Sequence, residues 1–336
     1  MNISHIRSAV LVPVALAVLA GCGKVASPAS QSPAGPAGSS QPASKPSAAP
    51  SAALSGPADV AARFPDLNNR GDTAGAATVF TDDAVLVGGA PCSLPSICKG
   101  PAAIAKRIEN AAASHIAQTI DGPPAVAGNQ VFMRLQIHND LDVKAGIERH
   151  MALVSATVQG DKIASWLAYD DLRDAQTAKY SLLQQSGGGA SPAASIADSE
   201  RVAVARQFQD ATARGDADAA AAAFSDNAVF IGGPACPPTA PCATPAAILK
   251  RAQAGVGTHN HDTLLGTPAV VGDLVQMRLE VRGDLITAAG AERVIVNVQE
   301  QLRGQKIASL VILPDITDAQ TAKYQLFLQQ QAGTKP

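Results

Sequence analysis

The chain has 336 residues, of which 46% are hydrophobic and only 3% aromatic, and its formal net charge is -2 at pH 7. This length is enough for two domains of ordinary size. Its basic residues are scattered and aromatic residues are scarce, so the sequence lacks the basic patch and stacking platforms of a nucleic-acid-binding protein, and we expect no nucleic-acid partner.

The N-terminal stretch, MNISHIRSAVLVPVALAVLAGC, has the features of an export signal. A weakly basic start precedes an apolar run over residues 9–20, which is shorter than the roughly 20 apolar residues that a transmembrane helix needs. The run ends in Leu19-Ala20-Gly21-Cys22, which resembles the lipobox of bacterial lipoproteins. The resemblance implies that residues 1–21 are a signal peptide and that the thiol of Cys22 carries a lipid. The alternative is an ordinary signal peptide that happens to contain a cysteine.

The next segment, residues 22–56, consists mostly of Ala, Ser, Pro and Gly after the cysteine. It has too little apolar surface to offset the entropy lost on ordering, so we expect a disordered tether. Stable anchoring needs more than one acyl chain, a condition that bacterial lipoproteins meet. We therefore expect the protein in the bacterial cell envelope, lipid-anchored on the outer side of the cytoplasmic membrane or on the outer membrane.

The rest of the chain contains a duplication at a constant offset. The heptapeptide DAQTAKY occurs at 174–180 and again at 318–324, which is 144 residues later (318 − 174 = 144). At the same offset, FPDLNNRGDTAGAATVFTDDAVLVGG matches FQDATARGDADAAAAAFSDNAVFIGG, and GDKIAS matches GQKIAS. A match of this length indicates two related domains, 57–185 and 198–331. Residues 186–197 are interpreted as a flexible linker and 332–336 as a tail.

Sequence signals predict helices in the first half and at the end of each copy. Val60, Phe64 and Leu67 recur at helical spacing over residues 57–69. Pro101 and Pro245 fit the first turn of a later helix, where the missing N–H of proline would be unpaired in any case. DAQTAKY then predicts a terminal helix in each copy, with its Asp as the N-cap.

Strand signals lie between these helices, at 115–120, 123–128, 130–138, 148–158 and 162–169 in the first copy. VFMRLQIH alternates, so that Met133 and Leu135 share an apolar face and the intervening polar residues lie on the other face. The matching strand of the second copy places Met277 and Leu279 on its apolar face.

This order of elements predicts an α+β fold with two tandem cone-shaped domains, each a curved antiparallel sheet packed on about three helices, followed by a terminal helix. RGDTAGAATVFTDDAVLVGG, PAAIAKRI, His115, AVAGNQV and GDKIASWLAYDD occur in an order that resembles the nuclear-transport-factor-2-like superfamily, in particular its SnoaL-like branch. The second copy has the same order, with His259 at the matching position. The resemblance implies an apolar pocket at the open end of each cone. It does not supply a function, because the family includes dehydratases, isomerases, cyclases and non-catalytic binding modules.

Four cysteines form two matching pairs with the spacing C-x5-C: Cys92 with Cys98, and Cys236 with Cys242. An exported protein meets an oxidising compartment, so we predict one disulfide in each pair. Closing so short a loop stabilises the fold by roughly 2 kcal/mol and stiffens the rim of the pocket. A metal site and a labile redox switch are the alternatives, although zinc sites usually have cysteines closer together and need further ligands.

Catalytic candidates lie in the first copy, but the second copy does not keep most of them. His150, Tyr169 and Asp170 correspond to Val294, Leu313 and Pro314. His115 corresponds to His259, and a structural histidine is the favoured interpretation there. We find no convergent acid and base in either copy, which an acid–base enzyme needs. We also predict no cofactor and no metal, since neither GxGxxG nor a Walker motif occurs and HNH at 259–261 lacks a third ligand.

The sequence therefore predicts a lipid-anchored binding or interaction protein that holds a small apolar ligand or an envelope protein. Its two domains are expected to pack as an intrachain pseudo-dimer through their polar sheet faces. The predicted ligand contacts are Met133, Leu135, His150, Met277, Leu279, His115 and His259. The alternatives are a dehydratase- or isomerase-type enzyme that uses His115 or His150 with Asp170 or Tyr169, and a structural envelope protein with collapsed cones.

Overall fold

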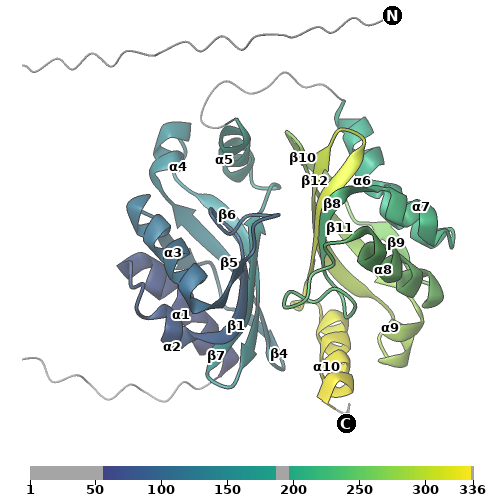
Figure 1. Cartoon of the computed structure of the whole chain (residues 1–336), viewed down its shortest axis with the longest axis horizontal. Coiled ribbons are helices and arrows are strands. Elements are labelled where there is room, and N and C mark those ends of the chain that lie inside the picture. The colour runs from purple at the N-terminus through teal and green to yellow at the C-terminus, as the bar shows by residue number, and fades with distance from the viewer. Residues whose placement is uncertain (1–55, 187–196, 334–336) are drawn as a thin grey trace, which may run out of the picture. The chain divides into compact units, whose positions relative to one another are not determined.

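The computed structural model describes residues 56–186 and 197–333. The predicted signal peptide and Cys22 lie outside the described residues, as do nearly all of the predicted tether and linker. Ala52–Pro336 forms one compact unit, and this unit contains two α+β repeats (Figure 1). Within the described ranges, no helix combines the length and apolar character needed to cross a membrane.

The first repeat begins with two helices, continues with strands that are interrupted by two further helices, and ends in a helix. Its helices are α1 (Pro57–Arg70), α2 (Ala76–Val79), α3 (Gly100–Ala113), α4 (Asp140–Ala145) and α5 (Ala175–Gln185). Its strands are β1 (Phe80–Val87), β2 (Cys98–Lys99), β3 (Ala117–Ile120), β4 (Ala125–Ala127), β5 (Gln130–His138), β6 (His150–Gln159) and β7 (Lys162–Asp170). The sheet order is β2-β1-β7-β6-β5-β3, and β4 also pairs with β5.

The second repeat has the same element order except that it lacks a named counterpart of β2. Its helices are α6 (Asp198–Ala213), α7 (Ala217–Ala222), α8 (Pro245–Gly257), α9 (Asp284–Ala288) and α10 (Ala319–Gly333). Its strands are β8 (Phe224–Ile231), β9 (His261–Leu264), β10 (Ala269–Val271), β11 (Leu274–Arg282), β12 (Val294–Arg303) and β13 (Lys306–Pro314). The sheet order is β10-β11-β12-β13-β8, and β9 pairs with β11.

The predicted α+β class is confirmed, and each sheet, expected to be antiparallel, is antiparallel except for one parallel pair. The first strand of each repeat pairs with the last strand in parallel: β1 with β7, and β8 with β13. These partners lie far apart in sequence, and the intervening chain is long enough to return to the same end of the sheet, as a parallel pair requires. Both sheets are therefore mixed.

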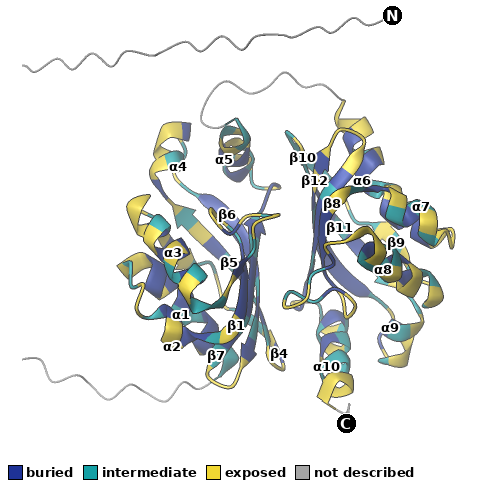
Figure 2. Ribbon diagram, viewed as in Figure 1, coloured by how far each residue is buried: buried dark blue, intermediate teal, exposed yellow. Residues whose placement is uncertain are grey.

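The apolar face of each sheet packs on the helices and forms a separate core (Figure 2). Met133 and Leu135 of β5 are 2% and 1% exposed, and Met277 and Leu279 of β11 are 1% and 2% exposed. The predicted alternation along these strands is thus confirmed. The helix signals are also confirmed: Pro101 and Pro245 occupy the first turns of α3 and α8, and each DAQTAKY aspartate caps its helix.

Two short helices, α4 and α9, were not predicted, although α4 has strong start and stop signals. The side chain of Asn139 accepts hydrogen bonds from the backbone N–H groups of Leu141 and Asp142, and Asp142 accepts one from the Asn139 N–H at 2.7 Å. This reciprocal arrangement is a capping box. Gly146 ends α4 at φ +60°, a conformation that glycine adopts without strain. Only six residues long, α4 lacks the periodicity by which longer helices are recognised.

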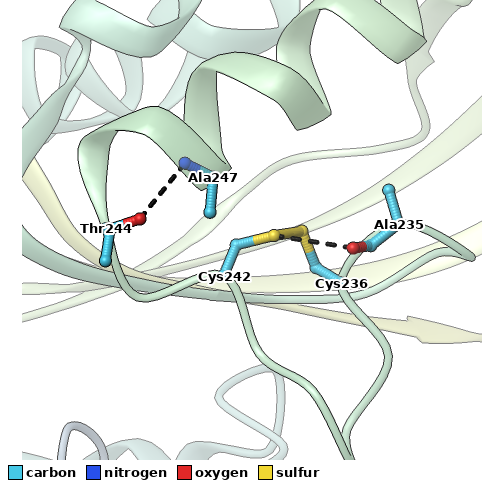
Figure 3. The surroundings of a disulfide bond; sticks show 5 residues. All are labelled: Ala235, Cys236, Cys242, Thr244 and Ala247. Carbon is cyan, nitrogen blue, oxygen red and sulfur yellow. Dashed lines mark hydrogen bonds between the residues drawn. A yellow bond between two sulfur atoms is a disulfide. The ribbon is translucent and has the colours of Figure 1, made fainter.

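The structure contains both predicted disulfides, Cys92–Cys98 and Cys236–Cys242. All four cysteines are buried and belong to the two cores. Figure 3 shows the second bridge beside the start of α8, where the Thr244 hydroxyl accepts a hydrogen bond from the Ala247 N–H at 3.2 Å. Each bridge therefore fastens a loop to the core just before a helix begins.

A third cluster of buried residues contains apolar side chains from both repeats. It includes Leu153, Leu167 and Tyr169 of the first repeat and Val311 and Leu313 of the second. These residues lie on the sheet faces opposite the helices. The expectation that polar side chains dominate this contact is therefore wrong for β6, β7 and β13.

Two glutamines at matching positions make reciprocal hydrogen bonds between the repeats. Gln185 of α5 donates to the Val271 carbonyl at 3.0 Å and accepts from the Asp273 N–H at 2.9 Å. Gln329, its equivalent in α10, donates to the Ala127 carbonyl at 2.9 Å and accepts from the Asn129 N–H at 3.1 Å. Each glutamine thus binds a turn of the other repeat, and the turn residues also correspond at the offset of 144.

The core of the second repeat contains one unusual polar pair, Glu300 and Gln209. Glu300 is fully buried, and its Oε1 accepts a hydrogen bond from Gln209 at 3.1 Å. The second carboxyl oxygen and the amide oxygen of Gln209 have no partner. Burial raises the pKa of Glu300 to about 8, against a smaller opposing effect of the Gln209 hydrogen bond. A proton on the carboxyl would supply the missing donor between these two oxygens.

We expect this carboxyl to make the stability of the protein depend on pH. Between the ordinary pKa of about 4.5 and the folded-state value of about 8, the folded protein keeps a proton that the unfolded chain has released. Stability should therefore fall as pH rises through this window and level off above it, by at most about 1.4 kcal/mol per pH unit. Glu300→Gln should raise the thermal unfolding midpoint at pH 8 relative to wild type, and the difference should vanish near pH 4.5.

Scanning calorimetry from pH 4.5 to 9 provides the measurement, with Glu292→Gln at an exposed position as the control. A Glu300→Gln midpoint that parallels wild type at every pH would show that the carboxyl does not titrate in this range.

Candidate functional site

A cavity with a volume of about 690 Å³ lies chiefly in the first repeat. Its apolar lining includes Phe64, Leu135, Ile137, Ala152, Trp166 and Ala168, and its polar lining includes Arg107, Asn139, Asp140, His150, Asp170 and Tyr180. The second repeat contributes Leu274, Gln299, Gln301, Ser309 and Val311. A volume in this range is typical of small-molecule sites, and the lining here combines an apolar wall with many polar side chains.

A buried histidine–aspartate pair forms one side of this cavity. His150 begins β6, and its Nδ1 lies 2.8 Å from an Asp142 carboxylate oxygen. His150 is 3% exposed and Asp142 is fully buried. A carboxylate can only accept, so the proton between them belongs to Nδ1. The other ring nitrogen, Nε2, makes no hydrogen bond to any described residue, and is the nitrogen left for a bound molecule.

Tyr180 of α5 completes this side of the cavity. Its ring stacks on the His150 imidazole, with centroids 3.7 Å apart and planes inclined by 8°. Asn139 donates a hydrogen bond to the Tyr180 hydroxyl at 3.3 Å. Burial, and then the nearby Asp170 charge, raise the pKa of Tyr180 to about 12, so its hydroxyl stays protonated at neutral pH. The imidazole is therefore held both by a carboxylate and by an aromatic ring, which fixes its orientation.

Asp170, at the end of β7, is the second carboxyl of the cavity. Its Oδ2 accepts a hydrogen bond from the Ser181 hydroxyl at 2.5 Å. Burial raises the pKa of Asp170, while the neighbouring His150 and Ser181 oppose that rise. A carboxyl whose pKa is raised by an apolar surrounding can carry a proton to or from a bound molecule.

The structure separates the other two catalytic candidates from this group. Tyr169 precedes Asp170 on β7 and so points to the opposite sheet face, where it belongs to the cluster shared by the two repeats. It also lines the cavity, on the side to which the second repeat contributes. Its hydroxyl is buried without a hydrogen-bond partner, and burial raises its pKa well above the ordinary value. The His115 side chain is 79% exposed, does not line the cavity, and lies 3.0 Å from Asp140.

The remaining predicted ligand contacts have different surroundings. Leu135 lines the cavity, whereas Met133 lies deeper in the same core. Met277 and Leu279 are buried in the core of the second repeat, away from this cavity. The His259 side chain is 80% exposed and lies 2.6 Å from Asp284, so it repeats the surface arrangement of His115.

The second repeat replaces the histidine–aspartate pair with apolar residues. At the offset of 144, Ile286 stands in place of Asp142, and Val294 in place of His150. Both are buried, at 4% and 3% exposure. The fold therefore accommodates an aliphatic pair where the first repeat has a hydrogen-bonded histidine–aspartate pair.

The same comparison shows that smaller side chains in the first repeat leave space for the cavity. Ala152 and Ala168 line it in the first repeat, and their equivalents are the larger Val296 and Ile312, which belong to or pack against the core of the second repeat. Burying larger aliphatic side chains fills space and adds favourable packing. The interior of the second repeat is thus more completely filled at these positions.

Two residues that line the cavity, Arg107 and Tyr180, were not predicted from the sequence, and neither was Asp142, which binds His150 from behind. Tyr180 belongs to the repeated DAQTAKY, from which only a terminal helix and its N-cap were predicted. Arg107 is also repeated, as Arg251, in PAAIAKRI and PAAILKRA, and a basic residue kept on the inner side of a helix was an available signal. Among the described residues, no cluster of three or more His, Cys, Asp or Glu side chains is arranged to hold a metal ion.

No protein-family model matches the chain. No curated protein matches it significantly either.

Several solved structures match about a third of the chain each. An NTF2-like protein of unknown function from Cytophaga hutchinsonii shares 13% identity over 35% of this chain and 93% of its own, with a TM-score of 0.28. The epoxide hydrolase/cyclase-like enzyme SalBIII of salinomycin formation shares 20% identity over 36% of this chain and 95% of its own, with a TM-score of 0.30. An LEH-like epoxide hydrolase from M. tuberculosis shares 13% identity over 40% of this chain and 98% of its own, with a TM-score of 0.30.

These similarities carry no conclusion about activity, because the identities and TM-scores are low. One match is described as NTF2-like, which is the superfamily that the sequence motifs resemble. The function must therefore be inferred from the cavity itself.

We predict that Asp142 and His150 are strongly coupled in stability. His150→Val alone leaves Asp142 buried without its imidazole, and removing one partner of a buried ion pair typically costs about 3–5 kcal/mol. The double variant His150→Val/Asp142→Ile carries the pair found in the second repeat, and should lose less stability than the single variant despite losing the capping box of α4. Urea unfolding of wild type, both single variants and the double variant measures the coupling. Additive effects of the two substitutions would contradict it.

Proposed function

We propose that the protein is an exported, lipid-anchored binding protein whose first repeat holds a small, largely apolar molecule. The observation that supports this most directly is the cavity of about 690 Å³, with its apolar wall and its oriented polar groups. The second repeat, whose matching positions are occupied by larger aliphatic side chains, is the supporting domain in this proposal.

The envelope location in this proposal depends on the lipobox at Leu19–Cys22 and on the disulfides. Disulfides persist in oxidising compartments and are rare in the reducing cytosol, so Cys92–Cys98 and Cys236–Cys242 favour an exported protein. The acyl chains on Cys22 would keep the binding domain at the membrane surface, where apolar molecules concentrate.

The two repeats are proposed to act as an intrachain pseudo-dimer. The reciprocal hydrogen bonds of Gln185 and Gln329 support this arrangement, since a two-fold interface pairs residue i with j and j with i. The apolar cluster around Leu167 and Val311 supports it too. Paired in this way, the second repeat would cover one side of the cavity.

A specific observation favours a second candidate function, acid–base catalysis in the same cavity. His150 is oriented by Asp142 and lies close enough to Asp170 for their charges to interact. Such a histidine and a carboxyl of raised pKa could exchange a proton with a bound substrate, as in dehydratases and isomerases. An enzyme would convert its ligand, whereas a binding protein would return the ligand unchanged.

Lipidation of Cys22 is tested by growing expressing bacteria with radioactive palmitate. The protein should be labelled and should fractionate with membranes. Cys22→Ser should lose the label and the membrane association. Cys98→Ser serves as the control, because it removes a cysteine that the proposal assigns to a disulfide, and it should keep the label. Equal labelling of wild type and Cys22→Ser would contradict the lipid anchor.

Binding in the first repeat is tested with N-phenyl-1-naphthylamine, a neutral apolar probe whose fluorescence rises in apolar surroundings. Trp166, the only tryptophan, lines the cavity and should transfer excitation energy to the bound probe. Ala152→Val/Ala168→Ile introduces larger side chains of the kind found in the second repeat and should weaken binding at least tenfold. Val296→Ile, at the position equivalent to Ala152, is the matched control and should bind like wild type.

If the double variant bound the probe as tightly as wild type, or if wild type showed no energy transfer from Trp166, binding in this cavity would be ruled out. Chemical analysis of the probe after incubation, or of any molecule that co-purifies, distinguishes binding from catalysis.

A further inference from the structure

Arg107 of α3 is a buried cation without a counterion. The residue is 6% exposed and lines the cavity. Its Nε donates a long hydrogen bond, 3.3 Å, to the Gly88 carbonyl, and its Nη1 is buried with no hydrogen-bond partner. No carboxylate of the described residues lies within ion-pair distance of it. A guanidinium keeps its charge under all ordinary conditions, and a buried charge is costly unless it is paired.

The neighbouring turn is shaped around this guanidinium. Gly89 has φ +69°, and a Cβ built on it would lie 2.8 Å from the Nη2 atom of Arg107. Any larger residue would therefore have to displace the guanidinium. The turn also leads into the loop closed by Cys92–Cys98, whose residues Ser93 and Leu94 line the cavity. The position of Arg107 is thus fixed by elements on two sides.

The second repeat has the same arginine, whose Nε is also buried without a hydrogen-bond partner, but its surroundings differ. The Cζ of Arg251 lies 5.2 Å from the centre of the Phe230 ring, within the range of a cation–π contact. Asp262 acts on Arg251 as an opposite charge. In the first repeat the corresponding residues are Leu86 and Gln118, an aliphatic side chain and a neutral amide. The Oε1 of Gln118 already accepts a hydrogen bond from Asn68 at 3.0 Å.

We propose that Arg107 binds the carboxylate head of an amphiphilic organic acid whose apolar body fills the cavity. This inference rests on the proposed binding function and names the chemical class of its ligand. The guanidinium can bind a carboxylate through two parallel hydrogen bonds, a geometry that matches its fixed fork of donors. The apolar wall formed by residues such as Leu135, Ile137 and Trp166 would contact the hydrocarbon part.

Two carboxyl groups, Asp140 and Asp170, also line the cavity, and their charges bear on an anionic ligand. Asp140 is half exposed and lies 3.0 Å from His115, which offsets its charge when the imidazole is protonated. Asp170 is half-buried and accepts a hydrogen bond from Ser181 at 2.5 Å, and burial raises its pKa, while His150 and Ser181 oppose that rise. Arg107 is therefore the buried charge that a bound carboxylate would meet.

The test compares sodium dodecanoate with 1-dodecanol, which share the hydrocarbon chain and differ in the charged head. Binding to the purified protein is followed through the fluorescence of Trp166 at pH 7.5, with both ligands below the concentration at which they aggregate. Wild type should bind dodecanoate at least tenfold more tightly than dodecanol. Arg107→Met should lose this preference while still binding dodecanol, and Arg107→Lys should keep part of it.

Arg251→Met, the equivalent change in the second repeat, is the matched control and should preserve the preference. Thermal unfolding establishes whether each variant is folded. If Arg107→Met does not fold, the ratio of the dodecanoate and dodecanol affinities still tests the role of Arg107. This ratio should be at least tenfold in wild type and smaller in Arg107→Lys.

The outcomes separate this inference from the proposed function. Equal affinities for dodecanoate and dodecanol in wild type, or a preference that survives in Arg107→Met, would overturn the role of Arg107 and leave apolar binding intact. Failure of both ligands to bind would overturn the proposed function as well.

Discussion

The alternation of side chains along the long strands determines which groups each repeat withdraws from water. In β6 and β7, the face toward the helices carries His150, Ala152, Trp166, Ala168 and Asp170, while Leu153, Leu167 and Tyr169 face the other way. The step of one residue from Tyr169 to Asp170 places Tyr169 in the shared apolar cluster and Asp170 on the helix side of the sheet, although both residues line the cavity. The cavity, the polar groups within it and the contact between the repeats all depend on this alternation of side chains between the two faces of the sheet.

The duplication separates what the fold requires from what one repeat adds. Both repeats keep the strand pattern, the disulfide, the inward arginine and the helix-capping aspartates. They differ at Asp142 and His150, where the second repeat has an aliphatic pair, and replacing a buried ion pair with aliphatic residues is often neutral or stabilising. The first repeat thus keeps a polar arrangement that the scaffold does not need, which is the property expected of a site. The second repeat has its own exception at Glu300, where the first has Ala156.

The sequence allowed the α+β class, the duplicated elements and the disulfide pairs to be predicted, because each depends on local signals: alternation over VFMRLQIH, proline at the start of α3 and α8, and the repeated C-x5-C. The parallel pairing of β1 with β7 has no local signal, since it joins segments about 80 residues apart. The Asp142–His150 contact escaped detection for a similar reason, because it requires α4 to bring Asp142 against β6. Residues that both copies keep were weighted most heavily, and this rule favours structural positions over a site present in only one copy.

A hollow interior in the first repeat, filled in the second, is the central claim, and crystals of the protein under xenon pressure test it most directly. Xenon enters apolar cavities that are large enough to hold it. We expect a xenon atom beside Trp166 and Ala152 in the first repeat and none between Leu310 and Val296, the equivalent positions of the second. An absence of xenon from the first repeat, or equal occupancy in the two repeats, would contradict the claim.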